Sequence, residues 1–136
     1  MEVVKGALSG SGAFVLTFVV SLVLLAVFAA VYSAITSHHE MVLIRAGNTT
    51  AALSFGGAIV GFVIPIGKAI AQSVGMTDLL VWSAIAFVAQ LLAYFAAGVL
   101  VPHLRKSIAD DHVASGILLT ALAVAIGVLN AAAMSL

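Results

Sequence analysis

Residues 40–57, with the sequence EMVLIRAGNTTAALSFGG, interrupt the first long apolar run of this chain. A second polar segment, LRKSIADDHVASGILLTA at residues 104–121, begins 64 residues further on and is also flanked by apolar runs. An order of features that recurs at a fixed spacing is the signature of an internal repeat. The sequence therefore predicts two tandem copies of a hairpin, each made of a helix, a polar gap and a second helix.

The composition indicates that lipid surrounds most of the chain. Hydrophobic residues make up 64% of the 136 residues and charged residues only 7%, whereas about one quarter of a soluble domain is charged. Backbone polar groups inside lipid must be satisfied within their own segment, which favours helices. Four charge-free runs reach the length of about 20 residues at which a helix crosses a bilayer; they are residues 6–37, 46–67, 79–102 and 113–136.

We therefore predict an all-α fold, an integral membrane four-helix bundle that forms a single domain over residues 1–136. The first span is expected to start near Ala13 and to be retained, because its apolar run exceeds the roughly 7 to 15 residues of a signal-peptide core. Repeat one covers residues 13–72 and repeat two covers residues 79–136. Since each repeat crosses the membrane twice, both enter from the same side, which predicts a parallel orientation about an axis along the membrane normal.

The basic residues give the expected sidedness. Arg45, Arg105 and Lys106 lie in the two polar gaps, whereas Lys5 and Lys68 lie at the opposite ends of the predicted helices. Loops on the cytoplasmic side carry an excess of lysine and arginine. This distribution predicts polar gaps in the cytoplasm and both termini in the periplasm.

Both polar gaps carry residues suited to helix ends and to contacts with a partner. Asn48 or Thr49 is expected to cap the second helix, and Asp110 or Asp111 the fourth. These gaps are predicted either to be structural, through such caps, or to recruit a peripheral protein or anionic lipid. The candidate loop face consists of Glu40, Arg45, Gly47, Asn48, Arg105 and Asp111.

A polar stripe is expected along the second helix, where small and polar residues recur at steps of three or four and so share one face. Because Pro65 has no N–H to donate to the Gly61 carbonyl, a kink or a free acceptor is expected there. Packing and interhelical amide bonds are the structural alternative to a water path, and Lys68 is expected either to line it or to snorkel to the interface. The candidate polar path consists of Gly61, Pro65, Lys68, Gln72, Gln90 and Asn130.

Small residues four apart predict close helix packing. Gly57 and Gly61 have this spacing on the second helix, and Ala121 and Ala125 have it on the fourth. These faces are predicted either to join the two repeats or to hold a homo-oligomer together. The fourth helix also has a face of small and polar residues, formed by Gly116, Thr120, Ala123, Gly127 and Asn130.

Several classes of function are excluded or disfavoured. A net charge of zero gives no basis for nucleic-acid binding. The chain has no cysteine, no phosphate-binding loop and only short aqueous segments, so we predict no enzymatic activity and no cofactor. The histidines have no known metal-binding spacing and are weak metal candidates at most; they are His38, His39, His103 and His112.

Four short motifs occur in a fixed order along the chain: EMVLIRAGN at residues 40–48, GFVIP at 61–65, VAQLLAYF at 88–95 and GVLNAAAM at 127–134. This order resembles the YjfL-like family of small bacterial inner-membrane proteins, a domain of unknown function. The resemblance covers nearly the whole chain and implies a multi-pass protein of the bacterial inner membrane with duplicated hairpins, in the context of envelope-stress systems. Lys68 departs from the family pattern, so any role of Lys68 is particular to this chain.

Two hypotheses for function follow. The first is an oligomeric small channel or transporter whose path follows the candidate polar path. The second is a structural or docking protein that recruits a peripheral partner through its cytoplasmic loops.

Overall fold

The computed structural model describes residues 2–36, 40–72 and 75–135, and in these ranges the chain forms six helices and no strand. The all-α prediction is confirmed, and four of the helices are long and apolar enough to cross a membrane: α1, α3, α4 and α6. The helices are α1 Glu2–Thr36, α2 Glu40–Arg45, α3 Thr49–Gln72, α4 Met76–Leu100, α5 Leu104–Ala109 and α6 Val113–Ala133.

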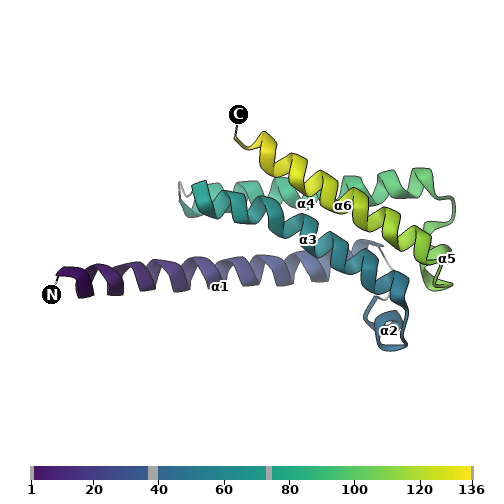
Figure 1. Ribbon diagram of the computed structural model, residues 1–136, viewed down its shortest axis with the longest axis horizontal. Helices are drawn as coiled ribbons and strands as arrows, with labels where there is room; N and C mark the ends of the chain where they lie inside the picture. Colours follow the sequence, from purple (N-terminus) through teal and green to yellow (C-terminus); the bar gives the residue numbers. More distant parts are fainter. Residues whose placement is uncertain (1, 37–39, 73–74, 136) are drawn as a thin grey trace.

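The centre of the bundle is formed by α3, α4 and α6, with α1 alongside (Figure 1). In the most apolar window of α3, 50% of the residues are buried, whereas in that of α1 only 6% are. The side chains that remain exposed on α1 are large and apolar, among them Phe14, Phe18 and Leu22. This is the pattern expected of a peripheral helix that faces lipid, because lipid tails are as apolar as leucine.

Helix α1 starts at Glu2, eleven residues before the predicted start near Ala13. A helix of its 35 residues is about 52 Å long, which exceeds the hydrocarbon thickness of about 30 Å. The first turns of α1 therefore extend beyond the rest of the bundle, as Figure 1 shows.

Aromatic contacts hold the second half of α1 on the bundle. The rings of Phe28 and Phe62 are stacked with centroids 4.2 Å apart, and Tyr32 meets Tyr94 edge to face at 6.1 Å. Phe28 and Tyr32 are buried, whereas the preceding half of α1 is largely exposed. Helix α1 is thus attached mainly through its C-terminal half.

The short helices α2 and α5 lie at one end of the bundle (Figure 1) and occupy the two polar gaps. After α2, Gly47 N–H donates to the Ile44 carbonyl and Asn48 N–H to the Leu43 carbonyl, both at 2.9 Å. This pair of hydrogen bonds is a Schellman motif, which requires a left-handed backbone conformation at the residue after the helix end. Gly47 supplies it with φ 90°. The sequence had predicted gaps without helices, because six-residue helices are too short to show a clear periodicity.

The turn after α5 has the same hydrogen bonds. Asp111 N–H donates to the Ile108 carbonyl at 3.0 Å and His112 N–H to the Ser107 carbonyl at 2.9 Å. Asp111 takes the left-handed conformation with φ 58°, which aspartate tolerates better than most residues. Both short helices, α2 and α5, therefore end in a Schellman motif.

Candidate functional site

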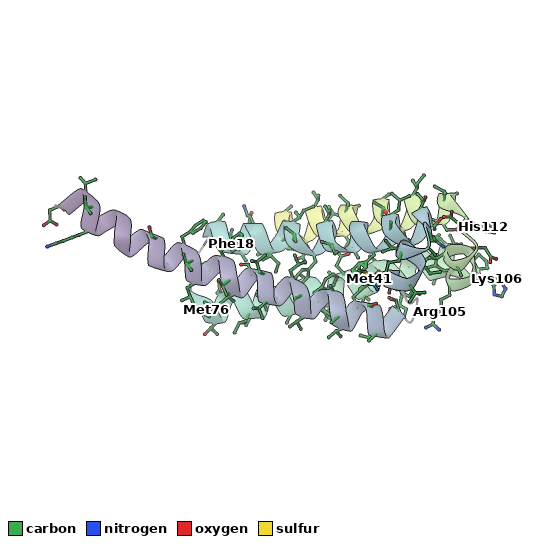
Figure 2. All side chains as sticks on the ribbon, turned by 90° about the horizontal axis from the view of Figure 1, so that it is seen from below. Phe18, Met41, Met76, Arg105, Lys106 and His112 are labelled. Atoms are coloured by element: carbon green, nitrogen blue, oxygen red, sulfur yellow. The ribbon has the colours of Figure 1, made fainter. Side chains whose placement is uncertain are left out.

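The loop side is the end of the bundle formed by α2, α5 and the first turns of α3 and α6. Figure 2 shows Arg105, Lys106 and His112 there, far from the start of α1. The loop side brings together all six residues of the candidate loop face, and the structure assigns them different roles.

Asn48 joins the two hairpins. Its side-chain oxygen accepts a hydrogen bond of 2.8 Å from Ala51 N–H, so Asn48 is the N-cap of α3. Its Nδ2 donates to the carbonyls of Ile108 at 2.8 Å and Ala109 at 3.3 Å, at the end of α5. One side chain, 9% exposed, therefore satisfies an amide of α3 and carbonyls of α5, and the prediction that Asn48 caps the second helix is confirmed.

Asp111 caps a different helix from the one predicted. Its Oδ1 accepts hydrogen bonds from the Thr50 N–H at 2.9 Å and the Thr50 hydroxyl at 2.7 Å, both on α3. Helix α6 has His112 as its N-cap residue, without a side-chain cap bond. The prediction that Asp110 or Asp111 caps the fourth helix is wrong, because His112 is the N-cap residue of α6 and the Asp111 carboxylate is bound to the neighbouring α3 instead.

The hydrogen bonds from the Thr50 N–H and hydroxyl hold the pKa of Asp111 below its usual range. A carboxyl group with a lowered pKa in the folded state stabilises the fold when ionised. This contribution is present above the pKa of the unfolded chain and is lost as the pH falls through the lowered value. The link between Asp111 and α3 is therefore intact at neutral pH.

Glu40 is buried rather than exposed on the loop face, with 2% of its surface accessible. Its carboxylate accepts hydrogen bonds from the hydroxyls of Ser33 at 2.5 Å and Thr36 at 2.8 Å, both in the last turn of α1. These bonds fasten the end of α1 to α2. The sequence reasoning missed the pairing because residues 33 and 36 belong to an apolar run, although a one-turn spacing of two hydroxyls before an acid is visible in it.

The basic residues of the loop side lie on the surface of the protein. Arg45, Arg105 and Lys106 are exposed, and so are Asp110 and Gly47. Arg105 is a hydrogen-bond partner of Tyr94 near the end of α4. The exposed charged side chains are thus attached to backbone that the hydrogen bonds of the two turns, after α2 and after α5, hold in place.

The candidate polar path is only partly assembled in the interior. Gly61, Pro65 and Gln90 are buried, Lys68 and Asn130 are half-buried, and Gln72 is exposed. Around Gly61 the helices are in close contact, because a Cβ placed on this glycine would lie 2.6 Å from Gln90 Nε2. In a single chain this region is packed rather than open.

Gln90 and Asn130 are imperfectly satisfied. Gln90 Nε2 donates to the Ala123 carbonyl on α6 at 3.1 Å. Among the described residues, Gln90 Oε1 and Asn130 Nδ2 are buried without a hydrogen-bond partner. A buried polar atom without a partner is costly and points to an unseen water, an ion or a second conformation.

Gly57 and Gly61 of α3 pack within the chain as one alternative predicted, whereas Ala121 and Ala125 of α6 do not join the repeats; whether they hold a homo-oligomer stays a prediction. Gly57 and Gly61 are buried, whereas Ala121 and Ala125 are exposed and do not pack within this chain. Helix α6 instead turns its other small-residue face inward: Gly116, Ala123 and Gly127 are buried, and Thr120 and Asn130 half-buried. The reason is steric, since close contact with α3 requires the flatter face of α6, which contains Gly116 and Gly127.

Close approach of α3 and α6 is visible at three levels. A Cβ on Gly116 would lie 2.9 Å from the Thr50 carbonyl, one on Gly57 2.7 Å from Thr120 Cα, and one on Gly127 2.8 Å from Gly61 Cα. The Thr120 hydroxyl also donates to the Leu53 carbonyl at 2.6 Å. The residue numbers of the contacting pairs increase along both helices, so α3 and α6 run in the same direction.

The histidines contribute little that the structure describes. His38 and His39 lie outside the described residues, and His103 and His112 are exposed on the loop side. Within the described ranges, no three His, Cys, Asp or Glu side chains form a group that could hold a metal ion. The weak metal prediction has no assembled site in this part of the chain.

Comparison with known proteins identifies the family. Residues 6–134 match the family described as Domain of Unknown Function (DUF350). The chain is similar to the UPF0719 inner membrane protein YjfL of Escherichia coli (strain K12), with 38% identity over 101 residues that cover 74% of this chain and 76% of the relative. The same name, identity and coverage apply to the relative from Escherichia coli O157:H7. No solved structure matches. The chain, whose four apolar helices are long enough to cross a membrane, therefore belongs to the DUF350 family.

Proposed function

We propose that this protein is a multi-pass docking protein of the bacterial inner membrane, whose loop side recruits a peripheral protein. The observation that carries this proposal is the rigid display of charge: Asn48 and Asp111 bind across the two hairpins, while Arg45, Arg105 and Lys106 stay exposed. Complementary charge on a preorganised surface favours association with a specific partner. The name of the Escherichia coli relative supports the inner membrane as the location.

The proposal includes a duplicated hairpin with parallel repeats. Helices α2 and α5, the two Schellman motifs and the starts of α3 and α6 are each separated by the same 64 residues, which supports this origin. The basic residues of the loop side support a cytoplasmic location for it, with both termini in the periplasm. The role is not enzymatic in this proposal, since the loops offer a surface rather than a pocket with catalytic groups.

Charge reversal tests the docking proposal. The triple change Arg45→Glu, Arg105→Glu and Lys106→Glu is expected to lower recovery of the specific peripheral partner at least about tenfold, because three attractive contacts become repulsive. The measurement is quantitative mass spectrometry of proteins cross-linked to the tagged chain in intact bacterial membranes. Lys5→Glu, at the other end of the molecule, is the matched control and should leave recovery unchanged. Equal recovery of every cross-linked protein from the wild-type chain and the triple variant would rule the proposal out.

A second candidate function is a small channel or transporter, and the unpartnered Gln90 Oε1 and Asn130 Nδ2 favour it. Polar atoms of this kind mark positions where water or an ion is stabilised at membrane depth. Because Gly61 is tightly packed, such a path requires the helices to separate or a homo-oligomer to form around it. The exposed Ala121 and Ala125 offer a small-residue face for that oligomer.

Ion flux through reconstituted vesicles distinguishes the two functions. If the protein transports K⁺ or protons, Gln90→Leu is expected to lower the flux at least about tenfold, because it removes the buried amide. Gly98→Ala, on the exposed side of the same helix, is the control. Wild-type vesicles that pass neither ion would contradict the transport hypothesis and leave the docking proposal untouched.

A further inference from the structure

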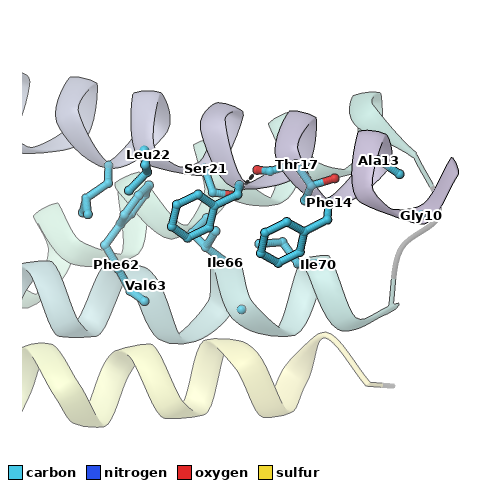
Figure 3. A pocket seen from close by; sticks show the side chains of 13 residues that line it. Gly10, Ala13, Phe14, Thr17, Ser21, Leu22, Phe62, Val63, Ile66 and Ile70 are labelled. Carbon is cyan, nitrogen blue, oxygen red and sulfur yellow. Dashed lines mark hydrogen bonds between the residues drawn. The ribbon is translucent and has the colours of Figure 1, made fainter. Parts of the chain in front are cut away.

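A groove of about 490 Å³ lies between residues 10–25 of α1 and residues 62–70 of α3. Figure 3 shows Phe14 and Leu22 on one wall and Phe62, Ile66 and Ile70 on the other. The groove exists because α1 is attached through Phe28 and its C-terminal half, so that its first half stands away from the bundle.

The lining calls for an apolar occupant. Its walls are aromatic and aliphatic side chains and glycines, and the two hydroxyl residues among them are Thr17 and Ser21. The Ser21 hydroxyl donates to the Thr17 carbonyl at 2.7 Å, one turn earlier in α1. That hydroxyl thus has its partner within the helix, and it needs none from a ligand.

The volume distinguishes a lipid chain from a helix. A cavity of about 150 Å³ holds the six carbons of benzene, so by proportion the 490 Å³ groove holds roughly twenty carbons. That is the size of one long acyl chain. A transmembrane helix, with a diameter of about 10 Å, would need several times this volume over the length of the groove.

Lys68 is next to Gly67 in sequence but is not a lining residue. It follows Pro65 by three residues and Gly61 by seven, so it shares their face of α3, which meets α6 rather than α1. The lining of the groove therefore contains no charged side chain, and apolar contact alone selects the occupant.

We propose that the groove between α1 and α3 binds one acyl chain of a phospholipid. The lipid fills the space that α1 leaves and ties the first half of this helix to the bundle. The inference does not depend on docking at the loop side, since the two sites lie at opposite ends of α3.

Two glycines allow the groove to be filled from either wall. Among the described residues, a Cβ on Gly67 or on Gly10 would meet no atom within 4 Å, and both residues line the groove. Leucine at either position is therefore compatible with the fold and occupies space that the acyl chain would take. Gly56 on α3 has equally open surroundings and is not among the lining residues, which makes Gly56→Leu the matched control.

The experiment is native mass spectrometry of the purified full-length protein, released from detergent micelles. The micelles contain phosphatidylglycerol with 16- and 18-carbon acyl chains, and this lipid serves only as the probe. The wild-type chain and Gly56→Leu are expected to retain one lipid. Gly67→Leu and Gly10→Leu should each reduce the retained fraction at least about tenfold, because leucine displaces several methylenes of the acyl chain. Lys68→Gln, a change outside the lining, should leave the retained fraction unchanged.

Retention that is equal in Gly67→Leu, Gly10→Leu and Gly56→Leu would overturn the proposal, as would a wild-type chain that retains no lipid. Circular dichroism of each variant checks that its helix content is unchanged. A groove-filling variant that loses the lipid while keeping its helix content supports the assignment, and normal cross-linking at the loop side in the same variant shows that docking is separate.

Discussion

Replacing Gly61 by alanine is expected to lower the free energy of unfolding by about 1 to 3 kcal/mol, as overpacking against fixed backbone does. The added Cβ would collide with the Ala123 carbonyl and would lie 2.6 Å from Gln90 Nε2. Its first neighbour is a backbone atom of α6, which cannot rotate away as a side chain would. The helices α3 and α6 would have to separate.

The same change also disturbs a hydrogen bond and a covered carbonyl. Gln90 Nε2 donates to the Ala123 carbonyl at 3.1 Å, the very group that the new methyl would displace. Pro65 has no N–H for the Gly61 carbonyl, and that carbonyl lies against Gly127, where a Cβ would meet it first. A glycine Cα–H in this position supplies a weak donor. Separation of the helices would expose this acceptor to lipid.

The measurement is a titration of the protein in mixed micelles with sodium dodecyl sulfate, followed by circular dichroism or tryptophan fluorescence. Gly127→Ala should be as destabilising as Gly61→Ala, because its Cβ would collide with the Gly61 carbonyl, a backbone atom of α3. Gly56→Ala is the control on α3: its Cβ would meet no described atom within 4 Å, so it should be neutral or stabilise by up to about 1 kcal/mol through helix propensity. A Gly61→Ala protein as stable as Gly56→Ala would show that α3 and α6 do not pack as described.

Asn48→Ala is expected to destabilise the protein by about 2 kcal/mol. Loss of the cap on α3 accounts for about 1 kcal/mol. Loss of the amide hydrogen bond to the Ile108 carbonyl, which keeps the Asp111 N–H as a donor, accounts for about 1 kcal/mol more. The atoms concerned are Ala51 N–H and the Ile108 carbonyl, each 2.8 Å from the Asn48 side chain. Both hairpins are affected, although only one residue changes.

Asn48→Asp separates the two roles of this side chain. Aspartate still accepts from Ala51 N–H as an N-cap, but it has no donor for the Ile108 carbonyl. We expect a loss of stability between those of the wild type and Asn48→Ala in the same titration. Thr49→Ala, which changes an exposed neighbour, should have little effect. If Asn48→Asp matched the wild type, the bond between the hairpins would contribute nothing to stability.

The membrane class and the number of spans were predictable because they depend on local composition. An uncharged run of about 20 apolar residues has few alternatives to a transmembrane helix. The cap at Asn48 and the glycine face of α3 were predictable for the same reason, since both follow from spacing within one helix. The small-residue face of α6 was visible as well, together with a competing pair, Ala121 and Ala125.

The rest depended on contacts between segments far apart in sequence. No spacing shows that Asp111 binds Thr50 rather than its own helix, or that Glu40 turns inward to the hydroxyls of Ser33 and Thr36. Each buried polar group binds the partner that gives the lowest free energy once the helices are packed, and this partner can belong to a distant segment. The extension of α1 to Glu2 was missed because the segment before Ala13 is rich in glycine and serine, which are poor helix formers.

By itself, the sequence determined an all-helical membrane protein with four apolar helices and two polar gaps, because hydrophobic transfer acts on each segment separately. Tertiary structure alone decided which face of α6 meets α3, which helix Asp111 caps, and that the first half of α1 leaves an apolar groove. Those outcomes depend on atoms brought together from different helices, where a single methyl group or one unpaired carbonyl determines which arrangement is stable.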